Sequence, residues 1–417
     1  MGNDLRPVRG TRDILDEEIL RFERILDATR RVSALYGFEP LSTPILEFTE
    51  VFKRTLGDAS DIVTKEMYTF DDRGGESLTL RPEFTAGVAR AFISNGLAQR
   101  APIKLYSHGP LFRYERPQKG RYRQFHQINI EILGTAEPGA DVEAITVGAH
   151  ILDTLGILGK TKLEINSLGD SASRDAYRAA LVKYFSGFKN DLSAESKIRL
   201  EKNPLRILDS KDPSDKKIVA DAPALGEHYS EDAKRFFDTV QEGLTASGVA
   251  YTVNPRIVRG LDYYCHTAFE FTTDLLGAQN AVLGGGRYDG LIEQMGGPKT
   301  PAVGFAAGIE RLALLLDEGK NHARPIAIIP IGAAAEKKAY ALARSLRDKK
   351  IRVELGFGGN AGKRMKRAAK RNTRAAVIFG DDELASKSYK IKQFDTGKEH
   401  TVPADMLAEA LSDDTGS

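Results

Sequence analysis

The sequence contains one cysteine, Cys265, among 417 residues, so no disulfide can form within the chain. A lone thiol is typical of proteins from a reducing compartment. The first residues, MGNDLRPVRGTRDIL, lack the apolar core of a secretory signal, and no run approaches the ~20 apolar residues that span a bilayer. These absences predict a soluble, cytoplasmic protein that does not engage a membrane.

Several common catalytic motifs are also missing. No GxxxxGK element followed by serine or threonine occurs, so ATP cannot be assigned through that kind of phosphate-binding loop. Residues 356–363 (GFGGNAGK) miss the pattern because Phe357 stands where the first glycine belongs, and residues 284–290 (GGGRYDG) do not match GxGxxG. The seven histidines show no HExxH spacing and cysteine pairs are absent, so no zinc site is indicated. No GxSxG nucleophile elbow occurs.

The bulk composition fits a multidomain globular protein. A length of 417 residues predicts two or three domains. Apolar residues make up 41% of the chain and charged residues 28%, which allows packed cores and a well-solvated surface. The net charge of +2 does not exclude nucleic-acid binding, because basic residues can cluster on one surface.

The first three quarters of the chain mix helical and strand-like patterns. Residues 17–36 carry apolar side chains at helical spacing, and Gly37 supplies a stop. Residues 111–133 read as two strands joined by a polar, basic turn. Residues 171–248 are rich in Lys, Asp and Ser, and residues 177–185 and 233–244 show helical spacing, which predicts a helical insertion. Further strands are predicted at residues 78–81, 103–107, 258–264 and 268–271, then a glycine-rich turn and a helix at residues 308–317.

A polar connector, residues 318–324 (EGKNHAR), leads to a different pattern. Strands at residues 326–329, 351–355 and 375–379 alternate with helices at 336–347, 363–371 and 404–411, the second of them basic. This alternation predicts a separate α/β domain. The predicted boundaries are 1–170 with 249–320 for the first domain, 171–248 for the insertion and 325–417 for the last domain.

Side chains two residues apart share a face of a strand. Residues 124–133 would therefore place His126 and three isoleucines on one face, and Gln127, Asn129 and Glu131 on the other. Such a polar face is most often exposed. Here, however, Arg113, Glu115, Arg116, Lys119, Arg121 and Arg123 lie in the preceding strand and turn. Cations and carboxylates then converge on one hairpin, which suits a zwitterionic substrate beside a polyphosphate.

Residues 79–85 (TLRPEFT) show a similar mixture. Arg81, Glu83 and Thr85 share a face if the segment is extended, and Pro82 argues against a helix interior. Glu83 could hold an ammonium group or form a surface salt bridge.

Three later segments also combine chemically useful side chains. Residues 259–264 (RGLDYY) place two adjacent tyrosines on opposite sides of a predicted strand, so at most one should line a given pocket. Residues 284–290 form either an ordinary turn or a close approach of backbone to a ligand. In residues 304–311 (GFAAGIER), Arg311 falls in the first turn of a predicted helix. The helix dipole does not stabilise a cation at that end, so a phosphate partner is plausible.

Together these motifs resemble the class II aminoacyl-tRNA synthetases, and most closely the histidyl-tRNA synthetase family. Residues 36–47 (YGFEPLSTPILE) resemble the family's first motif, residues 112–127 its second and residues 304–311 its third. Residues 259–264 and 284–290 resemble its histidine-specific segments. The resemblance runs from Arg9, in the segment RGTRD, to about Leu411. It implies an α+β catalytic domain on a mostly antiparallel sheet with a helical insertion, plus a C-terminal α/β anticodon-binding domain.

The resemblance also implies roles for single residues. ATP would be bound by Arg113 at the α-phosphate, Arg311 at the γ-phosphate, Arg121 at the phosphates and Tyr122 near the adenosine. Histidine would be bound by Glu83, Thr85, Gln127, Glu131, Tyr263, Tyr264 and Tyr288, with Arg259 at the reacting carboxylate and α-phosphate. Gln118 and Arg123 would approach the acceptor end of the tRNA. Cys265 and His266 depart from a variable part of the family pattern and receive no role.

The implied reaction joins L-histidine to tRNA(His) in two steps, through a histidyl-adenylate formed from ATP. Mg²⁺ would bridge the phosphates with few protein ligands, and residues 36–47 would form a homodimer interface. The basic segment 363–374, with Lys366 and Arg367, is either solvated surface or, in this context, an RNA-facing patch. Two rivals are a regulatory paralogue of the same fold, which lacks aminoacylation, and a synthetase for proline, threonine or glycine.

Overall fold

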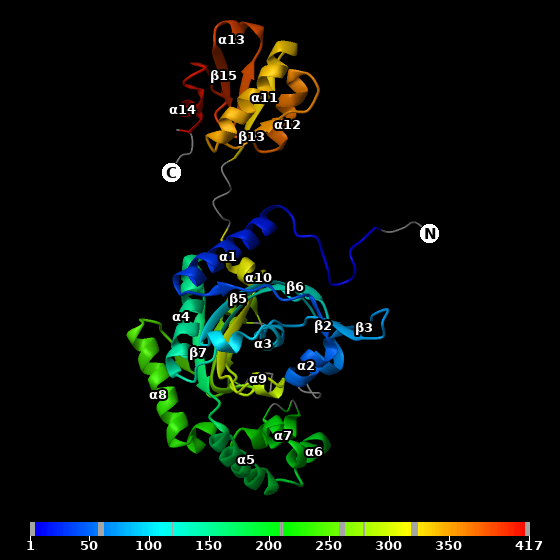
Figure 1. The fold of residues 1–417 in the computed structure, drawn as a ribbon, viewed down its shortest axis with the longest axis vertical. Coiled ribbons are helices and arrows are strands. Elements are labelled where there is room, and N and C mark those ends of the chain that lie inside the picture. The colour runs from blue at the N-terminus through cyan, green and yellow to red at the C-terminus, as the bar shows by residue number, and fades with distance from the viewer. Residues whose placement is uncertain are drawn as a thin grey trace. The chain divides into compact units, whose positions relative to one another are not determined.

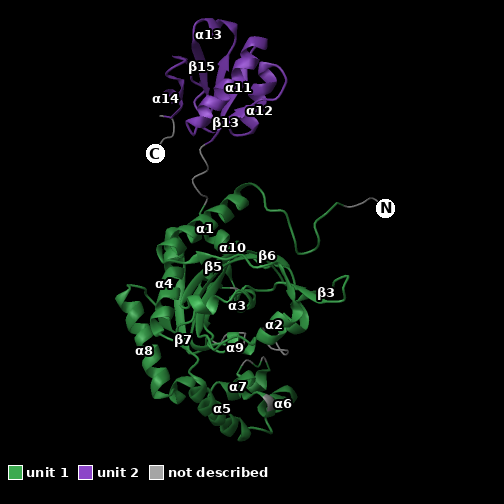
Figure 2. Ribbon diagram, viewed as in Figure 1, with its two compact units in different colours: residues 1–317 green, residues 318–417 purple. Residues whose placement is uncertain are grey.

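The computed structural model describes residues 5–56, 62–118, 120–208, 210, 212–257, 263–277, 280–317 and 324–412. The chain forms two compact units, residues 1–317 and 318–417, which Figure 2 colours separately. Each unit is built around its own large sheet. Among the residues that the structure describes, no helix is long and apolar enough to cross a membrane.

An eight-stranded sheet forms the centre of the first unit, in the order β1-β5-β6-β11-β10-β9-β7-β8. Its strands are β1 (Glu39–Pro40), β5 (Ile103–Phe112), β6 (Gln124–Leu133), β7 (Lys162–Ser167), β8 (Thr252–Val253), β9 (Cys265–Thr272), β10 (Ala281–Arg287) and β11 (Ala302–Gly308). The inner pairs are antiparallel, whereas the two edge pairs, β1 with β5 and β7 with β8, are parallel. The predicted mostly antiparallel sheet is therefore confirmed.

The two strands predicted at residues 111–133 correspond to β5 and β6, which pair from Ile103 with Leu133 to Phe112 with Gln124. The first of them is predicted too late, because β5 ends at Phe112 and includes the strand predicted at residues 103–107. The three isoleucines of β6 lie in the main core with helices α1 (Asp16–Leu35), α4 (Pro138–Thr154), α8 (Glu231–Ala246) and α10 (Ile309–Leu315). On the opposite face, Asn129 and Glu131 are each only 1% exposed. A solvent-exposed polar face, the ordinary expectation for such a strand, is therefore wrong for β6.

Helix α1 confirms the helix predicted at residues 17–36. Phe22, Ile25 and Val32 are buried in the main core. The chain leaves the helix through Gly37, whose φ of +75° lies in the left-handed region that favours glycine.

A second group of elements packs on the polar side of the sheet. It includes α2 (Thr49–Leu56), α3 (Thr85–Ser94), α9 (Leu291–Gln294) and a three-stranded sheet of β2 (Leu46–Phe48), β3 (Tyr68–Asp71) and β4 (Ser77–Leu80) in the order β2-β4-β3. Phe52, Phe92, Tyr263 and Tyr288 belong to the apolar cluster that joins these helices to the sheet. Figure 1 shows α3 and α9 on the concave side of the strands.

The predicted helical stretch contains α5 (Ser171–Ser186), α6 (Ala194–Lys202), α7 (Pro213–Val219) and α8. Tyr177, Leu181 and Phe185 of α5 form a small separate cluster with Leu192, Leu200 and Ile207. By contrast, Phe237, Val240 and Leu244 of α8 lie in the main core. The part of the stretch that packs by itself therefore precedes α8.

Two local predictions were wrong. The glycine-rich segment 284–290 is not a turn: its first four residues complete β10, in the middle of the sheet. Arg287 at the end of β10 is fully buried and pairs with Asp141 of α4, so it does not face a ligand. The strand predicted at residues 258–264 does not include Tyr263 and Tyr264, because β9 begins at Cys265. Residues 258–262 lie outside the described residues.

The second unit has the predicted α/β pattern. Its sheet has the order β13-β12-β14-β15-β16. The strands are β12 (Ile326–Pro330), β13 (Val353–Leu355), β14 (Ala375–Phe379), β15 (Ser388–Gln393) and β16 (Glu399–Pro403), and the helices are α11 (Ala333–Asp348), α12 (Ala361–Lys370), α13 (Asp381–Ala385) and α14 (Leu407–Ser412). The first three strands are parallel, and the antiparallel β15 and β16 are additional to the predicted elements.

Candidate active site

A cavity of about 510 Å³ lies against the polar face of β6. Its walls come from the loop before α3, the residues that follow β5, the residues before β9, and strands β10 and β11. Ten of the predicted site residues line it: Glu83, Thr85, Arg113, Arg121, Tyr122, Gln127, Tyr263, Tyr264, Tyr288 and Arg311. The fold thus brings together residues that are up to 228 positions apart, since Glu83 and Arg311 meet at one cavity.

Glu131 lies buried behind the cavity wall and is held by three donors. Thr85 Oγ1 donates to Glu131 Oε1 over 2.7 Å, and Asn129 Nδ2 donates to the same oxygen over 3.0 Å. The hydroxyl of Tyr288 donates to Glu131 Oε2. Burial raises the pKa of Glu131 to about 7, although these hydrogen bonds to the ionised form lower it. The carboxyl is therefore fixed in orientation and titrates near neutral pH.

One glycine leaves space for this carboxyl, and another leaves space for the ring of Tyr264. A Cβ on Gly304 of β11 would overlap Glu131 Oε2 and the carbonyl of Ile130. A Cβ on Gly286 of β10 would lie 2.9 Å from the ring of Tyr264. Close approach of side chains to the backbone, rather than a turn, therefore explains the need for glycine in these strands.

Three tyrosines form one side of the cavity. The ring centroids of Tyr263 and Tyr264 are 4.6 Å apart, and that of Tyr288 lies 5.7 Å from Tyr263. Both Tyr263 and Tyr264 line the cavity, so the expectation that only one of them would do so is wrong. The expectation assumed a regular strand, but both residues precede β9 and need not alternate faces.

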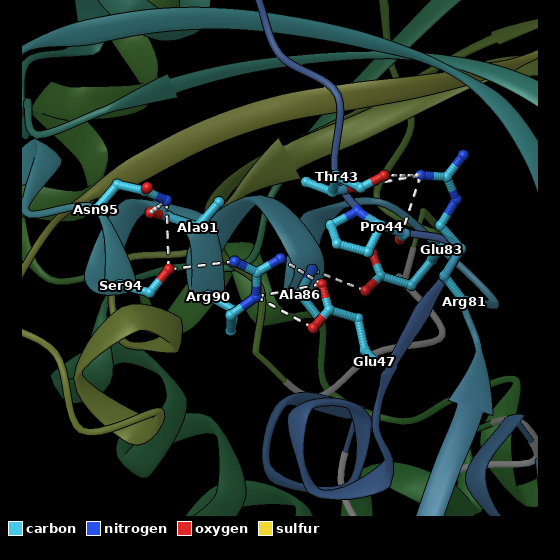
Figure 3. A network of polar contacts seen from close by, with 10 residues as sticks. All are labelled: Thr43, Pro44, Glu47, Arg81, Glu83, Ala86, Arg90, Ala91, Ser94 and Asn95. Carbon is cyan, nitrogen blue, oxygen red and sulfur yellow. Dashed lines mark hydrogen bonds and ion pairs between the residues drawn. The ribbon is translucent and has the colours of Figure 1, made fainter. Parts of the chain in front are cut away.

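The loop that carries Glu83 is shown in Figure 3. Glu83 accepts hydrogen bonds from the backbone N–H groups of Thr85 and Ala86 over 2.6 and 2.8 Å, at the start of α3. Burial raises the pKa of Glu83. A surface salt bridge is therefore wrong for Glu83, which is a buried carboxyl at the cavity.

Arg81 does not share a face with Glu83 and Thr85, because the segment is bent and α3 begins at Thr85. The Arg81 guanidinium donates to the carbonyl of Thr43 over 2.8 Å and to that of Pro110 over 3.0 Å. Nearby, Arg90 of α3 pairs with Glu47, as Figure 3 shows. These bonds attach residues 43–47 to the loop that positions Glu83.

Three arginines converge at another part of the cavity. Arg113 Nε donates to the carbonyl of Pro82 over 2.9 Å, and Arg121 forms an ion pair with Glu115 at 2.6 Å. Arg311 donates to the carbonyl of Ala281 over 2.7 Å. Burial lowers the pKa of Arg311, and the charges of Arg121 and Arg113 lower it further. Such a cluster of cations is stabilised by a multiply charged anion.

The amino-terminal segment 9–13 lies against the hairpin loop between β5 and β6. The backbone N–H of Arg123 donates to the carbonyl of Gly10 over 2.8 Å. The Arg12 guanidinium lies 4.4 Å from the ring centroid of Tyr122. Arg12 therefore packs on Tyr122, a contact that no local pattern in the sequence could reveal.

The remaining predicted residues lie elsewhere. Gln118 is exposed at the tip of the hairpin loop, and the Arg123 guanidinium lies 3.8 Å from the ring centroid of Tyr114 in the same loop. Arg259 lies outside the described residues. Lys366 and Arg367 are exposed on α12 in the second unit.

Sequence reasoning placed Asn129 on the polar face of β6 but gave it no role. Its amide nitrogen donates to Glu131 and, over 3.2 Å, to the carbonyl of Phe305. The carbonyl of Phe305 can only accept, so the orientation of the amide is fixed by chemistry. Asn129 thus ties the buried carboxyl to β11.

The cavity combines two opposite chemistries. One side has the carboxyl of Glu83 and three tyrosines, with Glu131 buried behind Tyr288, and the other side has the cations Arg113, Arg121 and Arg311. No group of three or more His, Cys, Asp or Glu suited to hold a metal occurs within the described part of the chain. The site can bind a small cationic or hydrogen-bonding molecule beside a polyphosphate.

Comparison with known proteins gives the same picture. A model of the histidyl-tRNA synthetase family matches residues 10–312, and a model of an anticodon binding domain matches residues 325–414. The histidine–tRNA ligase of Wolbachia pipientis subsp. Culex pipiens is 55% identical over 404 residues, which cover 97% of this chain and 99% of the relative. That of Rhodospirillum rubrum is 54% identical over 409 residues, which cover 98% and 99% of the two chains.

Solved structures agree. The crystal structure of an apo histidyl-tRNA synthetase from S. aureus is similar with a TM-score of 0.82 and 34% identity, covering 98% of this chain and 99% of that one. A Bacillus halodurans protein described as an ATP phosphoribosyltransferase regulatory subunit/histidyl-tRNA synthetase has a TM-score of 0.64 at 23% identity, covering 91% and 99%. That second likeness shows the fold alone.

The raised pKa of Glu131 predicts a specific pH dependence of stability. Its value of about 7 exceeds the ordinary 4.5, so the folded chain binds this proton more tightly than the unfolded chain does. The resulting stabilisation is fully present below about pH 4.5 and is lost as the pH rises through 7. As the pH rises between these limits, the free energy of unfolding of Glu131→Gln should increase by on the order of 3 kcal/mol relative to that of the parent protein.

Urea unfolding of both proteins across this pH range, without substrates, measures the difference. The exposed Glu50 supplies the control substitution, Glu50→Gln, which should show no such trend. A constant difference between the Glu131 variant and the parent would show that Glu131 ionises normally.

Proposed function

The chain belongs to the histidyl-tRNA synthetase family, and from this premise we propose how its residues attach histidine to tRNA(His). The reaction consumes ATP and proceeds through a histidyl-adenylate. The observation that carries the proposal is one cavity lined by three convergent arginines and by Thr85, Asn129 and Tyr288, which hold the buried carboxyl of Glu131 directly behind its wall. A nucleoside triphosphate needs the arginines, and an amino acid with a hydrogen-bonding side chain needs fixed acceptors and donors. Their reaction requires these two environments side by side.

Histidine is bound at the carboxyl end of the cavity. Glu131 and Tyr264 contact the imidazole, and Tyr263 and Tyr288 shape its pocket. Glu83, Gln127 and Thr85 receive the α-ammonium group. The supporting observations are the burial of both carboxyls and their hydrogen bonds, which fix the acceptors before the substrate arrives. A pocket that pairs both imidazole nitrogens leaves buried groups unpaired with other amino acids, and such sites discriminate by ~10⁴ or more.

ATP is bound at the arginine end. Arg113 holds the α-phosphate, Arg311 the γ-phosphate, and Arg121 also faces the phosphates, while Tyr122 lies near the adenosine. In support, burial and then the charges of Arg121 and Arg113 lower the pKa of Arg311, and a polyphosphate would stabilise the charged guanidinium against both effects. Glu115 and Glu310 line the cavity near the arginines and would face a Mg²⁺ ion bound with the nucleotide. Such an ion would supply positive charge that offsets the charge of the phosphates.

Neither chemical step requires a nucleophile from the protein. An oxygen of the histidine carboxylate attacks the α-phosphorus, and pyrophosphate leaves. A 3′-terminal ribose hydroxyl of the tRNA then attacks the activated carbonyl, loses its proton and displaces AMP. Arg259, with Arg113, stabilises the charge at the α-phosphate and the reacting carboxylate. Fixed arginines act by positioning and by charge stabilisation.

The tRNA contacts both units. Gln118 and Arg123, in the hairpin loop between β5 and β6, approach the acceptor end. Lys366 and Arg367 of α12 contribute to binding the anticodon region. In support, α12 carries five basic residues and no acidic one, and phosphate contacts supply much of the affinity for RNA.

The proposal includes a homodimer, formed through residues 36–47, that works in the cytoplasm. Ile45 and Leu46 are large apolar side chains that remain exposed in the monomer, and Phe48 extends this surface. Exposed apolar patches of this kind mark interfaces. The single cysteine supports a reducing location.

The regulatory paralogue is the second candidate and is disfavoured by two observations. The anticodon-binding domain is present, and the cations expected at the phosphates are present in Arg113, Arg259 and Arg311. A synthetase for another amino acid is disfavoured by the match to the histidyl family along residues 10–312.

Amino-acid-dependent exchange of pyrophosphate with ATP tests the function directly. With each of the twenty amino acids offered in turn, we expect exchange with histidine alone. Arg259→His should abolish exchange, because the cation at the α-phosphate is lost, while the thermal unfolding profile remains that of the parent. Exchange with no amino acid would favour the regulatory paralogue, and near-normal exchange in the variant would remove Arg259 from the reaction.

Charge reversal at Lys366 tests the role of α12. We expect Lys366→Glu to raise KM for tRNA several-fold, with a weaker dependence on salt, because one phosphate contact becomes repulsive. Lys349 follows α11 in the same unit and provides the control, Lys349→Glu. Equal KM values for the Lys366 variant, the control and the parent would show that α12 is ordinary solvated surface.

A further inference from the structure

The segment 9–13 is joined to the hairpin loop between β5 and β6 through the backbone. The N–H of Arg123 donates to the carbonyl of Gly10 over 2.8 Å. Gly10 has a φ of +87°, and a Cβ at this position would lie 2.6 Å from Cγ of Arg123. Glycine is therefore required both for the backbone conformation of the segment and for its close approach to the loop.

The same segment carries Arg12, whose guanidinium lies over the ring of Tyr122 at 4.4 Å from its centroid. Both terminal nitrogens of Arg12 donate to the carboxylate of Glu18, in the first turn of α1. This hydrogen bonding raises the pKa of Arg12, and the nearby charge of Glu310 acts in the same direction. The cation is therefore held by α1 while it covers the ring, as in a cation–π interaction.

Tyr122 lies between the tip of the loop and the start of β6. At the tip, Gln118 and Arg121 pair through two backbone hydrogen bonds of 3.0 and 2.9 Å. Tyr122 is among the described residues that line the active-site cavity, whereas Arg12 is not. Arg12 therefore acts on a molecule in the cavity through the ring that it covers.

We propose that Arg12 is a positioning residue for ATP, which fixes the ring of Tyr122 beside the adenosine while segment 9–13 holds the hairpin loop at the cavity. The inference rests on the proposed function, which places Tyr122 near the adenosine, and adds the residues that hold it there. A ring fixed before ATP arrives loses less conformational freedom on binding. Because the adenosine contact is equal in the ground state and the transition state, its loss should raise KM and spare kcat.

The kinetic test is histidine-dependent pyrophosphate exchange by the full-length protein. Arg12→Ala should raise KM for ATP about 10-fold, in the range of a partly desolvated cation–π contact, and leave kcat and KM for histidine nearly unchanged. Arg12→Lys keeps a cation near the ring and should restore most of the affinity. Arg235 of α8 is an exposed arginine paired with Asp232, so Arg235→Ala is the matched control and should behave as the parent.

Two further variants separate the side-chain contact from the backbone contact. In a Tyr122→Leu background, Arg12→Ala should have no additional effect on KM for ATP, because its partner is already absent. Gly10→Val should lower kcat as well as raise KM for ATP, because a displaced loop also moves Arg121 away from the phosphates. Additive effects in the first pair, or normal kinetics in Gly10→Val, would contradict the assigned roles.

A fluorescence measurement tests the packing without any catalysis. The chain contains no tryptophan, so Tyr122→Trp introduces a single indole. Adding Arg12→Ala to this variant should increase quenching of the indole by acrylamide, because the covering guanidinium is lost, whereas adding Arg235→Ala should not. Equal quenching with and without Arg12, or an unchanged KM for ATP in Arg12→Ala, would overturn the inference. Absence of exchange with any amino acid in the parent would instead refute the proposed function, and the quenching result would still stand.

Discussion

A carboxyl buried beside the middle of the eight-stranded sheet constrains the architecture of the whole first unit. Glu131 is 1% exposed, and a buried carboxyl is costly unless its oxygens are hydrogen-bonded. Its donors come from α3, from β6 itself and from the residue after β10. The sheet order places these elements around β6, and Gly304 on the adjacent strand leaves the space that the carboxyl occupies.

The two faces of β6 have different roles, one in the apolar core and one at the cavity. The isoleucines of β6 pack in the apolar core, so its polar residues are forced onto the opposite face, against the cavity. The loop before α3 then links distant parts of the site. Glu83 accepts from the first N–H groups of α3, while Arg81 and the Arg90–Glu47 pair attach residues 43–47, part of the proposed dimer interface, to that loop and helix (Figure 3). Association of two copies would therefore bear directly on the position of Glu83.

Much of this could be predicted from the sequence because periodicity reports local structure. The alternation in residues 124–133 predicted β6 and its two faces, and the spacing in the last hundred residues predicted α11, α12 and β14. Prediction failed where the structure depends on packing between residues that are distant in the sequence. Glycines in β10 looked like a turn, since only the structure shows how closely Tyr264 and Phe305 approach them. The adjacent tyrosines, the burial of Glu131, and the contacts of Asn129 and Arg12 likewise depend on residues far away in the sequence.

The central claim is that hydrogen-bonding groups fixed on the polar side of the sheet recognise both nitrogens of an imidazole. The most direct test is calorimetric binding of histidine and of its two singly N-methylated forms to the parent protein. We predict measurable binding of histidine and a loss of at least about 100-fold for each methylated form, because each leaves a buried group of the pocket unpaired. Equal binding of either methylated form would contradict the account.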